Sequence, residues 1–264
     1  MDAYFDDHVI RIGRGEPLLL IHGLGHCKEG WEPVLPGLGG RFDVAAIDLP
    51  GFNGAPELPV TPTDGALTDW CERVLDELGW ETAHIAGNSL GGLIGLRLGG
   101  RGRARSVTAI SPGGQTIGWE HRYQRVILRT LSALGPRLAR IPAVSDTALG
   151  RTLAMKVVFG KPERMTPGYA RASLEALRKE TAFKATLDAV EWQVADVKPI
   201  DAPVTIAWGS RDFLLLPRQG PRWVAELPGS RLVRLPGLGH TPMPDDPGMI
   251  VDVISRTAAA SAAS

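Results

Sequence analysis

The sequence has few cysteines, no excess of either charge and no long apolar run. Its two cysteines, Cys27 and Cys71, could form at most one bridge, which excludes a disulfide-built fold and favours a reducing compartment. Lys plus Arg and Asp plus Glu each total 29, so the basic excess typical of nucleic-acid binders and of binders of anionic membranes is absent. The apolar runs are much shorter than the roughly 20 residues that a membrane span needs.

The composition, with 44% hydrophobic and 22% charged residues, is typical of a soluble globular protein. A chain of 264 residues fits one α/β domain with an insertion. The first residues are acidic, whereas a secretory signal would be basic and then apolar. We therefore expect a cytoplasmic protein that acts on a small molecule, with no nucleic-acid or membrane partner. Its oligomeric state, monomer or homodimer, stays open.

Short aliphatic or β-branched runs alternate with helical patterns along the chain, which predicts a mostly parallel sheet flanked by helices. Most of these runs lack polar alternation, as expected of strands that are buried on both faces. Helices are predicted over Leu67–Leu78, ended by Gly79, and over Leu90–Gly99. Asp245 and Asp246 are expected to begin the last helix. The predicted strands are Val9–Ile12, Leu18–His22, Val44–Asp48, Ala83–Ala86, Val107–Ile110, Val204–Trp208 and Leu232–Leu235.

The strand signal is absent between about Trp119 and Trp192. A helical block between two strand regions predicts a lid, so we expect a core of residues 1–113 and 198–264 and a helical cap at 114–197. Trp119, Trp192 and Met155 are candidates for its pocket wall, although apolar residues at helical spacing more often belong to the core. The apolar stripes that predict its helices are Tyr123, Val126, Ile127, Leu131 and Leu134; Leu149, Leu153 and Val157; Leu174 and Leu177; and Phe183, Leu187 and Val190.

The segment Gly87-Asn88-Ser89-Leu90-Gly91 follows a predicted strand directly and precedes a predicted helix, as in the G-x-S-x-G nucleophile elbow. Turning within one residue forces Ser89 into a strained backbone region, and the two glycines remove side chains that would clash across the turn. The hydroxyl would then be exposed at the sheet edge, with the Leu90 N–H directed at a developing oxyanion. Alternatively, the serine merely caps the helix, so its partners must decide.

A serine hydroxyl becomes a good nucleophile only when a base takes its proton, and histidine suits that task at neutral pH. Among six histidines, His240 lies just past the last predicted strand, and Asp212 closely follows Val204–Trp208. The chain order Ser89, Asp212, His240 differs from that of trypsin-like and subtilisin-like proteases. Asp212 could instead belong to a turn and His240 to a surface loop. The coincidence of all three at strand ends favours a catalytic triad.

Residues 22–25, His-Gly-Leu-Gly, form a glycine-bracketed loop after a strand, which would let the Leu24 N–H turn inward as a second oxyanion donor. A metal site is the alternative, because His22 and His26 are four residues apart with Cys27 adjacent. A loop location without an acidic partner at ligand spacing disfavours it. A dinucleotide site is excluded, since Lys28 stands where the third glycine belongs. We therefore expect neither a cofactor nor a metal.

In these motifs the sequence resembles the α/β-hydrolases of the capped, single-domain kind over essentially its whole length. The resemblance implies that Ser89 is the nucleophile, His240 the general base and acid, and Asp212 its orienting partner. It also implies that the N–H groups of Leu24 and Leu90 form an oxyanion hole and that the cap chooses the substrate. The matching segments are His22-Gly23-Leu24-Gly25, Asp48-Leu49-Pro50-Gly51-Phe52, Gly87-Asn88-Ser89-Leu90-Gly91-Gly92, Trp208-Gly209-Ser210-Arg211-Asp212 with Pro217, and Gly239-His240-Thr241-Pro242 with Asp246-Pro247.

The expected function is that of a serine hydrolase, which cleaves a small or medium, largely apolar ester through an acyl-enzyme. Ser89 distinguishes the chain from dehalogenases and epoxide hydrolases of the same fold, which place aspartate at the elbow. The Gly-Asn-Ser-x-Gly-Gly form also resembles carbon–carbon-bond hydrolases of the meta-cleavage type, although these typically carry tryptophan where this sequence has Thr241. A lactonase, a thioesterase, a biosynthetic cyclase and a receptor without turnover remain alternatives.

Overall fold

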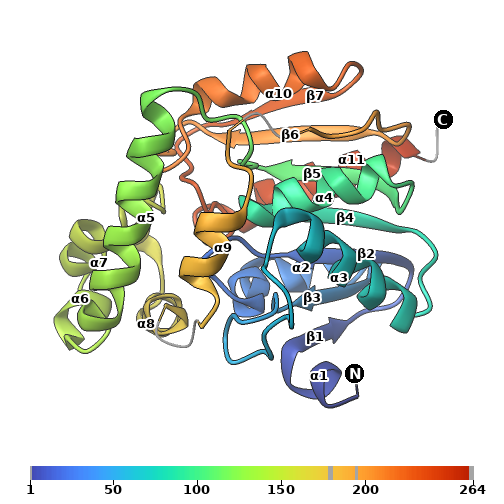
Figure 1. The fold of residues 1–264 in the computed structure, drawn as a ribbon. Helices are drawn as coiled ribbons and strands as arrows, with labels where there is room; N and C mark the ends of the chain where they lie inside the picture. The colour runs from blue at the N-terminus through green and yellow to red at the C-terminus, as the bar shows by residue number, and fades with distance from the viewer. Residues whose placement is uncertain (1, 178–180, 194–195, 262–264) are drawn as a thin grey trace.

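A seven-stranded sheet forms the centre of the computed structural model, which describes residues 2–177, 181–193 and 196–261 (Figure 1). The strand order is β1-β3-β2-β4-β5-β6-β7, in which β1 runs antiparallel to β3 and every other pair is parallel. All seven predicted strands are present with ends shifted by a few residues, and the α/β fold class is confirmed. The strands are β1 (Val9–Ile12), β2 (Glu16–Ile21), β3 (Phe42–Ile47), β4 (Ala83–Asn88), β5 (Ala104–Ile110), β6 (Val204–Gly209) and β7 (Arg231–Leu235).

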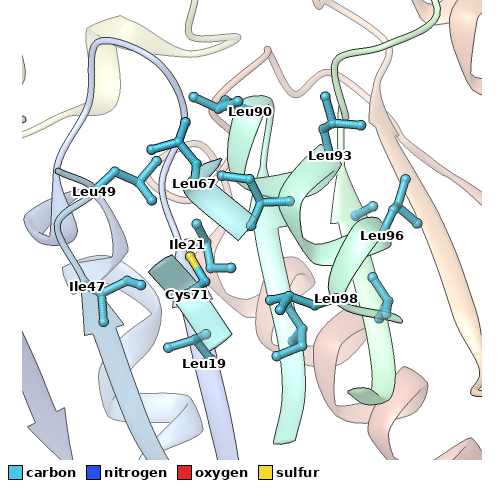
Figure 2. Close-up of a cluster of buried hydrophobic side chains, with 14 of the residues drawn as sticks. Leu19, Ile21, Ile47, Leu49, Leu67, Cys71, Leu90, Leu93, Leu96 and Leu98 are labelled. Atoms are coloured by element: carbon cyan, nitrogen blue, oxygen red, sulfur yellow. The ribbon is translucent and has the colours of Figure 1, made fainter. Parts of the chain in front are cut away.

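Helices cover both faces of the sheet. Successive strand residues point to opposite sides, so strands made of apolar residues present an apolar surface on each face that helices bury. Leu19 and Ile21 of β2 pack into one cluster, partly drawn in Figure 2, to which several helices contribute side chains. Among these helices are α3 (Asp64–Glu77), α4 (Leu90–Gly100) and α10 (Gly220–Glu226). Leu18 and Leu20 pack on the opposite face. The elements there are η1 (Lys28–Val34), α2 (Leu35–Leu38) and α11 (Pro247–Ser261), while α1 (Asp2–His8) contacts β1 and η3 (Pro217–Gln219) precedes α10.

The two core helices predicted from the sequence are confirmed as α3 and α4. The Thr63 hydroxyl caps α3 by accepting the backbone N–H of Ala66 at 3.1 Å. Gly79 follows this helix with a φ of 72°, a conformation that side chains disfavour, so the helix ends there as predicted. None of the helices in the described part of the chain is long and apolar enough to cross a membrane.

The chain between β5 and β6, residues 111–203, carries helices and, in its described residues, no strand. We call it the inserted segment. In Figure 1 its helices α5 to α8 stand beyond the carboxyl ends of the parallel strands. The boundaries 114–197 for a cap stay a prediction. The helices are α5 (Trp119–Leu138), α6 (Pro142–Asp146), α7 (Ala148–Met155), η2 (Pro162–Arg164), α8 (Pro167–Ala176) and α9 (Phe183–Ala189).

The predicted apolar stripe Leu149, Leu153 and Val157 is wrong at its first two positions, whereas Val157, just after α7, is partly buried against the core. Leu149 and Leu153 are 69% and 78% exposed, whereas Arg151 and Met155 of the same helix are buried. The Arg151 guanidinium donates to three backbone carbonyls in α6 and η2, at 2.7 to 3.1 Å. Its burial therefore depends on carbonyl groups of two other short helices, which the periodicity of α7 does not reveal.

The predicted stripe of α5 is wrong in part. Val126 and Leu134 are exposed, and the buried face carries Glu120, Gln124 and Leu128 instead. Glu120 forms ion pairs with Arg218 and Arg222 of the core, so charge pairing docks the first turn of α5. Other stripe residues of the inserted segment are buried as predicted, namely Leu174, Phe183, Leu187 and Val190.

Candidate active site

Ser89 lies at the sharp turn between β4 and α4. Its φ of 57° and ψ of −113° are a costly conformation for a residue with a side chain. A Cβ added to Gly87 would lie 2.1 Å from the Gly91 carbonyl oxygen, and one added to Gly91 would lie 2.1 Å from the Ile21 carbonyl oxygen. The turn packs so closely against itself and against β2 that only glycine fits at either position.

Asn88, next to the nucleophile candidate, joins the turn to the loop that carries His240. Its side-chain amide donates to the Ile110 carbonyl at 3.1 Å and to the His240 carbonyl at 2.9 Å. The Thr241 hydroxyl donates to the Asn88 side-chain oxygen at 3.3 Å. The sequence analysis missed this role, because residues 152 positions apart leave no local pattern.

Asp212 and His240, in the loops after β6 and β7, form a buried pair. His240 Nδ1 lies 2.8 Å from Asp212 Oδ2. The other carboxylate oxygen accepts the backbone N–H groups of Leu214 at 3.0 Å and Leu215 at 2.8 Å. The carboxylate is therefore fixed in place, and by accepting the Nδ1 proton it leaves His240 Nε2 as the ring's acceptor.

Ser89 and His240 line the same cavity, which lies between the carboxyl edge of the sheet and the inserted segment. Within the described residues no hydrogen bond joins their side chains, and such contacts commonly tighten only when substrate binds. Leu24 lines this cavity as well, and a Cβ on neighbouring Gly23 would lie 2.9 Å from Ser89 Cβ. The Leu90 side chain points into the hydrophobic cluster of Figure 2, so this residue can offer the site only its backbone.

The remaining wall of the cavity is mainly apolar and comes largely from the inserted segment. Met155 lines it as predicted. Neither tryptophan belongs to the described lining, and Trp192 belongs to the core, as the alternative interpretation predicted. Trp119 is exposed beneath the Arg218 guanidinium, and Trp192 is buried with its indole N–H donated to the Leu187 carbonyl at 3.0 Å. Apolar side chains of the wall include Leu128, Met155, Phe159, Leu174, Leu177 and Phe183.

Asp245 does not begin the last helix as expected; it connects the inserted segment to the loop before His240. Its Oδ2 accepts the backbone N–H groups of Gly160 and Gly239, both at 2.8 Å, and its Oδ1 accepts that of Lys161 at 2.8 Å. Burial raises the pKa of the Asp245 carboxyl, while the three N–H groups act in the opposite direction. The residue that caps α11 is Asp246, whose carboxylate accepts a backbone N–H of the first turn.

His22 has a structural environment rather than that of a metal ligand. Its Nδ1 donates to the Gly23 carbonyl at 2.8 Å, and its Nε2 accepts the Leu49 N–H at 2.9 Å, so both ring nitrogens are occupied. Cys27 and Cys71 are free and buried, and burial raises the pKa of both thiols. In the described ranges, no three His, Cys, Asp or Glu side chains form a group that could hold a metal ion.

Comparison with known proteins supports the same fold. The family model described as "Alpha/beta hydrolase family" matches residues 18–253. The epoxide hydrolase EphH of Mycobacterium tuberculosis is 32% identical over 210 residues, which cover 73% of this chain and 94% of that protein. The pimeloyl-acyl carrier protein methyl ester esterase of Neisseria meningitidis serogroup B is 29% identical over 84% of this chain and 85% of its own. The solved structure of naproxen esterase (carboxylesterase NP) from Bacillus subtilis matches with a TM-score of 0.73 at 18% identity, covering 94% of this chain and 86% of that chain.

Proposed function

Since this chain belongs to the alpha/beta hydrolase family, we propose that it is a serine hydrolase that cleaves small to medium apolar carboxylic esters. The observation that carries the proposal is the shared cavity of Ser89 and His240, with the imidazole bound through Nδ1 to the buried Asp212 carboxylate. Ser89 is the nucleophile, His240 the general base and acid, and Asp212 the group that orients the imidazole.

The reaction proceeds in two steps through an acyl-enzyme. Ser89 Oγ attacks the ester carbonyl carbon while His240 Nε2 takes the hydroxyl proton. The resulting oxyanion accepts hydrogen bonds from the backbone N–H groups of Leu24 and Leu90. The alcohol then leaves with the proton from His240. Water attacks the acyl-enzyme with His240 again as base, which releases the carboxylic acid and restores the serine. Every group in this scheme is supplied by the chain and by water, so no cofactor is invoked.

The serine at the elbow favours ester chemistry over epoxide opening. An aspartate that attacks an epoxide forms an ester, whose carbonyl water can then attack to release the enzyme. Ser89 in the same reaction would form an ether, which has no carbonyl carbon, and the nucleophile would not be regenerated. The likeness to EphH therefore supports the family, while the residue type at position 89 supports an ester substrate.

We further propose that residues 114–197 form a cap that selects the substrate. Most of the apolar side chains in the cavity wall come from this region, including Leu128, Met155 and Phe183. Such a wall favours substrates whose acyl or alcohol part is hydrocarbon. The similarity to a methyl ester esterase is consistent with this substrate class.

A fluorophosphonate probe tests the activated nucleophile directly. We expect labelling of Ser89 in the wild-type protein and none in Ser89→Ala, whereas Ser261→Ala, a change in α11, labels normally. Turnover of p-nitrophenyl butyrate should exceed that of matched lactones, thioesters, epoxides and vinylogous diketones. Absence of both labelling and turnover would favour a ligand receptor, and faster cleavage of another class would replace the ester proposal.

A further inference from the structure

The beginning of α5, in the inserted segment, lies against the loop that carries Asp212. The Tyr123 hydroxyl donates to the Phe213 carbonyl at 2.5 Å, across 90 positions of the chain. Burial raises the pKa of this phenol, and the negative charge of Asp212 raises it further, so the phenol keeps the proton that it donates. The inserted segment thus contacts the residue directly after the proposed triad acid.

The peptide group between Phe213 and Leu214 connects this contact to the Asp212 carboxylate. The peptide is trans, so its carbonyl and its N–H point in opposite directions within one plane. The carbonyl end accepts from Tyr123, and the N–H end donates to Asp212 Oδ1 at 3.0 Å. Rotation of the peptide would break both hydrogen bonds, and each bond polarises the group that makes the other. The phenol therefore orients a donor that holds the carboxylate.

The other donor to Asp212 Oδ1 is supported from the core. The Leu215 N–H donates to this oxygen at 2.8 Å, and the Leu215 carbonyl accepts the indole N–H of Trp208, in β6, at 3.0 Å. The core and the inserted segment each steady one of the two residues that donate to this oxygen.

Ion pairs keep Tyr123 over this loop. Glu120, which lies one turn earlier in α5, is buried and pairs with Arg218 and Arg222. Both arginines follow Asp212 within a few residues of the chain. The first turn of α5 is thereby docked on the segment that begins with the proposed triad acid.

We propose that Tyr123 is a positioning residue that holds the Asp212 carboxylate, through the Phe213–Leu214 peptide, where it orients His240. This inference rests on the proposed function and adds a residue to its machinery. Tyr123 does not belong to the described lining of the cavity, so it acts on the triad and not on the substrate. Turnover then depends on the docking of α5, because a displaced α5 withdraws the phenol from the loop.

Tyr123→Phe removes the hydroxyl and keeps the ring. We expect the rate constant for fluorophosphonate labelling of Ser89 to fall roughly 5-fold or more. The values of kcat/KM for p-nitrophenyl acetate and p-nitrophenyl butyrate should fall with it by a common factor, because the substrate does not meet the phenol. No fall in the labelling rate would overturn the inference, and so would a fall for one ester alone.

A second background separates positioning from a general loss of packing. In Asp212→Ala the Leu214 N–H has no carboxylate to hold, so Tyr123→Phe should change the slower labelling rate by no more than about 2-fold. The matched control is Tyr169→Phe, which removes the hydrogen bond from another phenol of the inserted segment to the Gly30 carbonyl of the core. Its effect should be the same with and without Asp212. An equally large effect of Tyr123→Phe in both backgrounds would overturn the inference.

Failure of the serine hydrolase proposal is read separately, as absence of labelling and of p-nitrophenyl butyrate hydrolysis in the wild-type protein. The low-field NMR signal of the His240 Nδ1 proton, identified by its loss in His240→Ala, then reports on the pair with Asp212. Tyr123→Phe should shift or broaden this signal, and Tyr169→Phe should leave it in place. An unchanged signal in Tyr123→Phe would contradict the positioning role.

Discussion

Gly160 donates its backbone N–H to the Asp245 carboxylate at 2.8 Å, across 85 positions of the chain. The same carboxylate oxygen accepts the N–H of Gly239, the residue before His240. One buried side chain thus positions the proposed cap and the loop of the proposed general base together. A shift of the backbone at Gly160 should therefore also shift the backbone at Gly239.

Asp245→Asn should weaken this connection. Asparagine replaces one carboxylate oxygen with an NH2 group, so at least one of the three backbone N–H groups would face another donor. We expect a loss of about 1–3 kcal/mol in the free energy of unfolding and a several-fold fall in kcat/KM. Urea unfolding and p-nitrophenyl butyrate hydrolysis measure the two effects. The control Asp246→Asn alters only the cap of α11, and an equal stability loss in both variants would contradict the connection.

Removal of the proposed triad should abolish most turnover. Ser89→Ala and His240→Ala should each lower kcat by about 10⁴–10⁶. Asp212→Asn should lose somewhat less, because its remaining oxygen can still accept from the backbone while its NH2 group faces His240 Nδ1 and favours the wrong tautomer. Steady-state kinetics on p-nitrophenyl butyrate measures all three. A wild-type kcat in Ser89→Ala would remove Ser89 from the mechanism.

The elbow should tolerate no side chain at Gly91. The added Cβ would lie 2.1 Å from the Ile21 carbonyl oxygen and 2.6 Å from that of His22, and backbone atoms can relax little. We expect Gly91→Ala to lose at least about 2–3 kcal/mol in the free energy of unfolding, measured by urea denaturation. The matched control is Gly168→Ala, also at the second position of a helix, where nothing lies within 4 Å. It should gain up to about 1 kcal/mol. Similar values for both would refute the steric argument.

The burial of His26 should make stability depend on pH. The unfolded imidazole takes up a proton near its ordinary pKa of 6.5, whereas the folded ring does so only at about 4. The unfolded state therefore binds more protons between these values, and the free energy of unfolding falls as the pH falls through that window. Between pH 7.5 and pH 5 this residue should account for about 2 kcal/mol.

His26→Gln removes that contribution. The difference in unfolding free energy between the wild-type protein and this variant should therefore change with pH, as urea denaturation at pH 5 and pH 7.5 would measure. Burial also lowers the pKa of His22, which is present in both proteins, so its contribution cancels in the comparison. Parallel pH profiles would place His26 in a more hydrated setting.

Features that depend on neighbours in the chain were predictable. The strands could be recognised because both of their faces are buried, which leaves residues such as Leu18 and Leu19 uniformly apolar. The spacing of Gly87 and Gly91 follows from a turn that folds back on itself within a few residues. Helix stripes failed where the buried face of the helix carries a charged side chain with partners in other segments, as at Arg151 of α7 and Glu120 of α5.

The amino-acid sequence alone determined the central sheet, the strained turn at Ser89 and the candidates for its partners. Each of these features depends on residue type and on spacing over a few neighbouring residues. Tertiary structure alone decided that Asn88 holds the loop of His240, that Asp245 joins that loop to Gly160, and that His26 is a buried residue of the cavity wall. Those contacts depend on how distant segments approach one another, and a hydrogen bond across many residues imposes no periodicity on the chain.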